Sequence, residues 1–233
     1  MFGELSFTLN YNSGYYDEAQ LTAFMQAYQE SLEAIIEHCQ QVGLGPYTPS
    51  DFPLAKVTQD SLQVWQQDKE IEDLYPATGM QQGLLFHSLL EAGSYVTQTR
   101  VSFKGLNVAA FKGAWSGLLQ SHGIFRTGFV GVESGQAHQR VEKAVPLGWH
   151  EEDLSQMTSA EQAQYLDDYQ ERDKRRGFDI TAAPLMRCSL FKQGDEQTLL
   201  WSIHHALLDG WCSPLVFGEI NRRYEALLAG QAE

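Results

Sequence analysis

The chain has 233 residues, 43% of them hydrophobic, which is enough for a packed core in one large or two small domains. Its 16 basic and 30 acidic residues give a formal net charge of −14 at neutral pH. Nucleic acid and anionic membrane surfaces are therefore poor partners, because both require a cationic face. We interpret the acidic excess as a solvated surface.

The cysteine content and the absence of long apolar runs indicate a cytoplasmic protein. Cys39, Cys188 and Cys212 are odd in number and far apart, without a CxxC pair. This favours buried thiols in a reducing cytoplasm over disulfides or a zinc site. No run reaches about 18 apolar residues, so no membrane span is expected. The N-terminus lacks the basic and apolar regions typical of a secretion signal.

The first 42 residues predict one strand followed by one helix. Apolar and polar residues alternate from Leu5 to Tyr11, which is typical of a strand. Asp17 and Gln20 then have the spacing of a capping box. Apolar residues recur every three or four positions after it, until the helix ends before Gly43. One strand and one helix cannot bury both apolar faces, so we expect this piece to dock on something else, in this chain or outside it.

Residues 43–70 are interpreted as an interdomain linker. Residues 43–53 contain two glycines and three prolines, which favours an ordered or semi-rigid connection and a domain boundary. A short polar helix is expected within residues 58–69. The predicted organisation is thus an N-terminal piece (1–42), a linker (43–70) and a second unit (71–233).

The second unit is predicted to be α/β, with a mixed sheet and flanking helices. Thr78 and Gln81 form another capping box, starting a helix that runs to about Leu90. Hairpin and crossover connections are mixed along the chain, and this predicts a mixed sheet. The further elements expected are a strand at 97–103, a helix after Asn107, a hairpin at 125–130 and 137–141, a helix at 159–176, strands at 185–191 and 198–203, and a helix at 214–228.

The most informative segment is the loop 204–210, which begins with two adjacent histidines. The apolar run 198–203 predicts a strand that delivers them. Successive strand side chains point to opposite faces, so we interpret His204 as a core residue and His205 as the one open to reactants. Imidazole and carboxylate groups together are suited to proton handling. A metal site would need a sharp backbone turn and a third ligand, which is not obvious.

The remaining polar groups of this loop have both structural and functional interpretations. Asp209 is interpreted as a structural acid in a buried ion pair, with Arg126 as a candidate partner; direct polarisation of the His205 imidazole is the alternative. Gly210 would permit a backbone conformation or close approach that a side chain would block. The amides of Gly210 and Trp211 precede a helix start, where developing negative charge is favoured.

No nucleophile is evident in the sequence. GxSxG, P-loop and GxGxxG patterns are absent, and Cys212 and Ser213 are interpreted as helix-start residues. The favoured chemistry is therefore transfer between two bound substrates, with His205 handling a proton and no covalent enzyme intermediate.

At these residues the chain resembles a nonribosomal peptide synthetase condensation domain, whose motif is HHxxxDG. Residues 204–210 match that motif completely. Three earlier segments, 75–87, 122–129 and 176–187, resemble further motifs of the family in the right order. Phe125 stands where the family usually has leucine. Four motifs in order make a chance similarity very improbable.

The resemblance implies a fold like that of chloramphenicol acetyltransferase, with two lobes and the HHxxxDG loop in the cleft between them. Only the first lobe, about residues 70–233, is covered. It implies amide formation between an acyl or peptidyl thioester and an aminoacyl amine, each carried on the phosphopantetheine of a carrier protein. His205 would be catalytic, as base or positioning group, and Asp209 structural, with Arg126 as a candidate partner. His204 and Gly210 would shape the loop.

The same resemblance implies which partners this chain needs. They are the upstream and downstream carrier domains and the missing second lobe, without which we expect the chain to be inactive; whether it is an enzyme by itself stays open. It would bind no cofactor or metal directly. Residues 1–50 resemble the C-terminal end of a preceding epimerization or condensation domain, and the type of opening motif favours epimerization. The alternatives are a non-catalytic interdomain docking fragment and a CoA-dependent acyltransferase.

Overall fold

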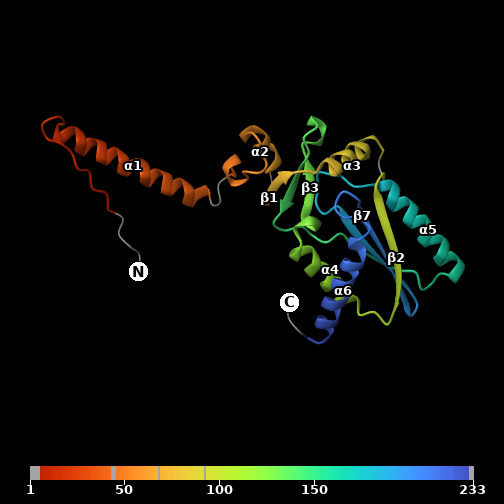
Figure 1. Cartoon of the computed structure of the whole chain (residues 1–233). Coiled ribbons are helices and arrows are strands. Elements are labelled where there is room, and N and C mark those ends of the chain that lie inside the picture. The colour runs from red at the N-terminus through yellow and green to blue at the C-terminus, as the bar shows by residue number, and fades with distance from the viewer. Residues whose placement is uncertain (1–5, 43–45, 68, 92, 231–233) are drawn as a thin grey trace. The chain divides into compact units, whose positions relative to one another are not determined.

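The structure is a computed structural model that describes residues 6–42, 46–67, 69–91 and 93–230. The chain divides into two compact units, Met1–Pro46 and Tyr47–Glu233, each described by itself (Figure 1). In the first unit, α1 (Glu18–Val42) follows Asp17, as the sequence predicts. The Asp17 carboxylate accepts a hydrogen bond from the Ala19 amide at 2.9 Å, and this satisfies one of the free donors at the helix start.

The strand predicted for Leu5–Tyr11 is not formed. Leu5 lies outside the described residues, and residues 6–12 have no regular secondary structure. A strand requires a neighbour for its backbone N–H and C=O groups, and no described residue of this unit supplies one. Phe7 instead packs edge-on against Tyr28 of α1, with the ring centroids 5.1 Å apart. Exposed apolar side chains remain on this unit at Phe7, Leu9, Tyr11, Phe24, Tyr28, Ile35 and Ile36.

The boundary between the units differs from the predicted linker, because residues 47–67 pack on the second unit. They include a short 3-10 turn, η1 (Pro49–Asp51), and α2 (Gln59–Trp65), which Thr58 caps. Leu62 of α2 is fully buried. A small core forms around it from Phe52, Ala55, Leu62, Ile71, Leu74 and Val130. Sequence analysis did not identify the residues that anchor this stretch, Phe52, Ala55 and Leu62, because most of its other residues are polar.

The second unit contains a three-stranded antiparallel sheet with the order β1-β4-β3. Its strands are β1 (Ile71–Pro76), β3 (Thr127–Val130) and β4 (His138–Glu142). β3 and β4 form the predicted hairpin, around a 3-10 turn, η3 (Val132–Ser134). The hairpin starts two residues later than predicted, because Gly123–Arg126 forms another 3-10 turn, η2. β1 was not predicted.

The second sheet has four strands in the order β2-β7-β6-β5 and is mixed, as predicted. β2 (Val96–Lys104) pairs antiparallel with β7 (Glu196–His204), and β7 pairs antiparallel with β6 (Met186–Gln193). β5 (Trp149–Asp153) lies parallel to β6 at the edge. Sequence reasoning missed β5, because four of its five residues are charged or histidine and show no apolar alternation.

Helices cover both faces of this sheet (Figure 1). α4 (Val108–Ser121) and α6 (Cys212–Leu228) pack against the face that presents Leu199 and Trp201. α5 (Ser159–Arg176) packs against the opposite face, at Phe191 and Leu200. α3 (Gly79–Leu90) begins at the predicted Thr78–Gln81 capping box. None of the helices in the described ranges is long and apolar enough to cross a membrane.

The packing of α2 gives a stability prediction. Truncating the buried Leu62 with Leu62→Ala should lower the free energy of unfolding by about 3 kcal/mol, through lost burial and a residual cavity. Val64 lies two residues further along the same helix and is 68% exposed. Val64→Ala should therefore change the unfolding free energy by no more than about 0.5 kcal/mol. Urea unfolding followed by circular dichroism measures both. Equal, small effects would show that α2 is not anchored to the second unit.

Candidate active site

The loop 204–210 leaves the end of β7, and His204 is the last residue of that strand to pair with β2. The His204 side chain is buried, with 1% of its surface exposed. The Ser88 hydroxyl of α3 donates to the Leu84 carbonyl at 2.8 Å and lies 2.9 Å from Nε2 of His204. The Ala206 amide donates to Nδ1 at 3.1 Å. Nε2 therefore carries the ring proton and donates it to Ser88.

The environment of His204 keeps its imidazole neutral. Burial, followed by the neighbouring His205, lowers the pKa of His204 from 6.5 to about 4. A positive charge on the ring would also break the bond in which Nδ1 accepts from Ala206. Both ring nitrogens thus serve to hold the loop, and the placement agrees with the core role expected for this histidine.

His205 is the first residue of the turn after β7 and is exposed. Its Nδ1 is 2.8 Å from the carbonyl oxygen of Leu208, an acceptor, so Nδ1 carries the proton of the neutral ring. Nε2 is then the unprotonated nitrogen, and no atom of the described residues hydrogen-bonds to it. The His205 amide donates to the carbonyl of Tyr95 at 2.8 Å. The ring is thereby oriented with a free lone pair available to a reactant.

Asp209 does not form the predicted ion pair with Arg126. It is exposed, and its Oδ1 accepts from the Trp211 amide at 3.1 Å and from the Cys212 thiol at 3.2 Å. Asp209 therefore forms a local Asx turn just before α6, whose N-cap residue is Trp211. Its hydrogen bond raises the pKa of the Cys212 thiol, which agrees with Cys212 as a helix-start residue rather than a nucleophile.

Two expectations about the neighbouring backbone are also corrected. The Trp211 amide is occupied by Asp209, so it is not free to stabilise negative charge. Gly210 has no left-handed φ, and a Cβ built on it would meet no described atom within 4 Å. A side chain would thus fit at position 210, as far as the described part of the chain determines.

Arg126 is instead a structural residue whose partners come from α4, β1 and β4 and the residue after β4. Its guanidinium is buried and donates to the carbonyls of Leu119 at 3.1 Å and Lys143 at 3.2 Å. It also contacts the Glu142 carbonyl and pairs with the Glu72 carboxylate. Arg126 joins the end of α4 to β1 and β4. A buried guanidinium takes the nearest acceptors, and these carbonyls cannot be identified from sequence spacing.

Sequence reasoning missed two residues of α3 that hold the loop. Gln81 Nε2 donates to the Ala206 carbonyl and to the side chain of Gln139, both at 3.0 Å. Ser88 lies seven residues later and bonds to His204. Residues seven apart lie two turns apart on one helix face, so a single face of α3 contacts the loop at two points. The sequence indicates Gln81 only as a capping residue, and it is one, since its Oε1 accepts from the Thr78 amide.

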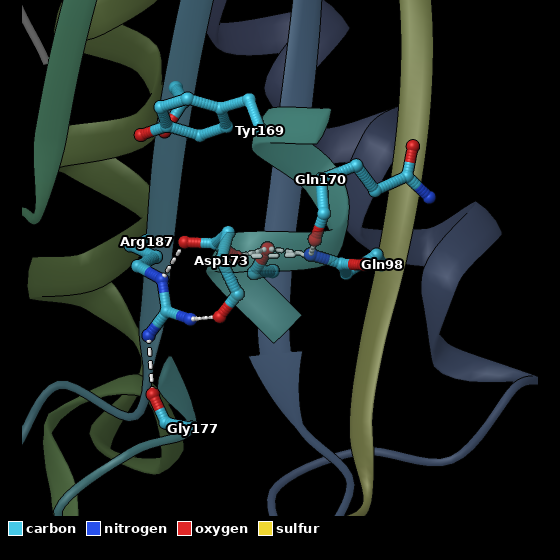
Figure 2. A network of polar contacts seen from close by, with 8 residues as sticks. Gln98, Tyr169, Gln170, Asp173, Gly177 and Arg187 are labelled. Atoms are coloured by element: carbon cyan, nitrogen blue, oxygen red, sulfur yellow. Dashed lines mark hydrogen bonds and ion pairs between the residues drawn. The ribbon is translucent and has the colours of Figure 1, made fainter. Parts of the chain in front are cut away.

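A second support comes from the buried carboxylate of Asp173, in α5 (Figure 2). It pairs with Arg187 of β6 and accepts from Gln98 of β2 at 3.0 Å. The Arg187 guanidinium lies 4.1 Å from the centroid of the Phe178 ring. That ring meets the imidazole of His204 edge-on, with centroids 6.4 Å apart. The network therefore supports the closed side of the loop.

Comparison with known proteins agrees with this fold. The family model for the condensation domain matches residues 71–232. A subunit of the linear gramicidin synthase of Brevibacillus parabrevis is 39% identical over 232 residues, which cover 98% of this chain and 3% of that protein. A subunit of the mycosubtilin synthase of Bacillus subtilis is 34% identical over 234 residues, which cover 97% of this chain and 9% of that protein.

Solved structures show the same fold at lower identity. The first condensation domain of the calcium-dependent antibiotic synthetase, in complex with a substrate analogue, matches with a TM-score of 0.61 and 18% identity, over 70% of this chain and 41% of that one. The starter condensation domain of rhizomide synthetase, in a mutant form in complex with C8-CoA, matches with a TM-score of 0.63 and 17% identity, over 75% and 39%.

The fold thus matches that of condensation domains from nonribosomal peptide synthetases. The chain belongs to the condensation-domain family. It spans less than a tenth of the length of the two synthetases compared above.

The burial of His204 predicts a pH dependence of stability. The folded-state pKa is depressed, so the unfolded state binds the additional proton and stability falls as the pH drops from 6.5 to about 4. The loss from this group should be about 3 kcal/mol across that window. His204→Gln should make the decline shallower by that amount, whereas His205→Gln removes only the smaller of the two causes and should make it shallower by much less. Urea titrations between pH 4 and 7 measure the slopes; parallel curves for His204→Gln and the unchanged chain would contradict the assignment.

Proposed function

We propose that residues 71–233 form the N-terminal lobe of a condensation domain that makes an amide bond between two carrier-bound substrates. The observation that carries this proposal is the Nε2 of His205, to which no described residue hydrogen-bonds, on a ring whose Nδ1 is fixed by the Leu208 carbonyl. The HHxxxDG motif and the family membership support it. Because the chain holds one lobe, we expect it to be inactive alone.

The chemistry requires one proton acceptor and no covalent enzyme intermediate. The amine of a carrier-bound aminoacyl group attacks the thioester carbonyl of the donor, and Nε2 of His205 takes the proton released from nitrogen. The C–S bond breaks, and the imidazolium returns the proton to the leaving phosphopantetheine sulfur. The Leu208 carbonyl keeps Nδ1–H directed at it, so the ring orientation is held while Nε2 takes up the proton. Should His205 only position the amine, the proton would leave through solvent.

The partners proposed are two carrier domains and a second lobe. Large apolar side chains near the loop are exposed, including Trp211 at 88% and Leu215 at 74%, on either side of the start of α6. Surface of this kind is typical of an interface, and we assign it to the second lobe. No cofactor or metal is assigned to this lobe. Free thiols at Cys39, Cys188 and Cys212 support a cytoplasmic location.

Residues 1–42 are proposed to be the end of a preceding epimerization or condensation domain. The match to the gramicidin synthase protein covers 98% of the chain, so it includes most of this unit. The alternating segment Leu5–Tyr11 and the apolar side of α1 suit a strand and a helix that complete a neighbouring sheet. The remaining residues before Tyr47 would connect the two domains.

The catalytic assignment is tested by His205→Ala in the domain with its second lobe supplied. Loss of the proton acceptor should lower turnover of loaded carrier proteins by roughly 10²- to 10⁴-fold, measured as amide product by mass spectrometry. His150→Ala is the matched control, since His150 lies on β5, the opposite edge strand from β2, and is exposed. It should leave turnover unchanged. Full turnover by His205→Ala would refute the assignment.

One observation favours a second candidate, a CoA-dependent acyltransferase. A related condensation domain has been solved with C8-CoA. If this chain used CoA directly, acyl transfer from octanoyl-CoA to a free amine would proceed without any carrier protein. Absence of that activity, together with carrier-dependent amide formation, supports the first candidate. Absence of both in the two-lobe protein would favour a docking fragment without chemistry.

A further inference from the structure

One strained backbone residue lies directly beside the candidate site. Tyr95, just before β2, has a φ of +59°, and Lys56 is the other non-glycine residue with positive φ in the described ranges. An aromatic residue in this conformation costs about 1–3 kcal/mol unless the surroundings impose it. Packing of the ring offsets little of this cost, because Tyr95 is 39% exposed and its ring lies 6.3 Å from that of His87, centroid to centroid, in a tilted contact.

The Tyr95 backbone instead holds the catalytic candidate. The regular ladder between β2 and β7 ends at the pair Val96 and His204. Beyond it, the Tyr95 carbonyl accepts a hydrogen bond from the His205 amide at 2.8 Å. The position of this oxygen therefore fixes where the His205 backbone lies.

A tight contact with α5 fixes the Tyr95 conformation in turn. Gly93 has a φ of +89°, and a Cβ built on it would lie 2.4 Å from the carbonyl oxygen of Lys174. The Val96 amide closes the turn by donating to the Gly93 carbonyl at 3.3 Å. The turn is thus pressed against the backbone of the last turn of α5, with no space for a side chain at Gly93.

The end of α5 is itself immobilised by Arg187 (Figure 2). The guanidinium pairs with the Asp173 carboxylate and donates to the Gly177 carbonyl at 2.8 Å. A continuous set of contacts therefore runs from Arg187 through the end of α5 and the Gly93–Val96 turn to the amide of His205.

We propose that the Gly93–Val96 turn is a positioning device for His205, and that Tyr95 is a positioning residue acting through its carbonyl oxygen in the left-handed conformation. This inference rests on the proposed role of His205. On this proposal the left-handed conformation of Tyr95 is retained because it places the backbone of His205, and not because it packs the tyrosine side chain.

Two substitutions at Tyr95 separate the backbone from the ring. Asparagine tolerates positive φ, whereas β-branched valine does not. Tyr95→Asn should keep the turn, and the His205 amide should exchange with solvent at the original rate. Tyr95→Val should displace the carbonyl and raise that exchange rate at least about ten-fold, followed by NMR on the intact chain. Equal rates in the two variants, whether both fast or both unchanged, would overturn the proposal.

A second pair of variants tests the contact with α5. Gly93→Ala places a methyl group against the Lys174 carbonyl and should also raise the exchange rate of the His205 amide about ten-fold. Gly105→Ala is the matched control, since Gly105 has a φ of +66° at the other end of β2, but a Cβ there meets nothing within 4 Å. It should leave the His205 amide unchanged. Similar exchange in both alanine variants would overturn the proposed contact.

Activity of the two-lobe protein distinguishes this proposal from the function on which it rests. Tyr95→Val should lower kcat about ten-fold with KM unchanged, whereas Tyr95→Asn should keep the kcat of the unsubstituted protein. If His205→Ala retains full turnover, the proposed function fails, while the exchange measurements still decide whether the turn positions the histidine backbone. If kcat of Tyr95→Val is unchanged although its exchange is fast, the turn does not serve catalysis.

Discussion

Two adjacent imidazoles at the end of β7 must occupy different environments, because neighbouring side chains on a strand project to opposite faces. His204 is the last residue of β7 and is buried, whereas His205 is the first residue beyond it and is exposed. Ser88 and the Ala206 amide take both ring nitrogens of His204, and its pKa falls to about 4. His205 is exposed, and its Nε2 accepts no hydrogen bond from any residue that the structure describes. Two consecutive residues thus have different roles: His204 is structural, and His205 is accessible to a reactant.

The parts of this fold that depend on local signals could be predicted from the sequence. Capping residues at Asp17, Thr78 and Asn107 mark helix starts, because each satisfies backbone donors within its own turn. The apolar run before His204 is long enough to define β7. β5 could not be predicted, because it is short and charged and carries no apolar run. Its pairing with β6 is visible only in the folded chain.

The interactions that build the site are long-range, and here sequence reasoning was weaker. The sequence offers Arg126 as a candidate partner of Asp209, but the buried guanidinium bonds to backbone carbonyls and to Glu72 instead. The alternation at Leu5–Tyr11 describes a strand only when a neighbouring strand is available. Gln81 has a local explanation as a cap, and this concealed its contact with the Ala206 carbonyl 125 residues away.

The attachment of residues 47–67 to the second unit has a consequence for dividing such chains. Family matching begins at residue 71, which suggests that position as a place to cut. A protein cut there would uncover Ile71, Leu74 and Val130, whose apolar surface is covered by Phe52, Ala55 and Leu62. A module intended for exchange between synthetases should therefore begin at Tyr47, the first residue of the second unit, because this small core then stays intact.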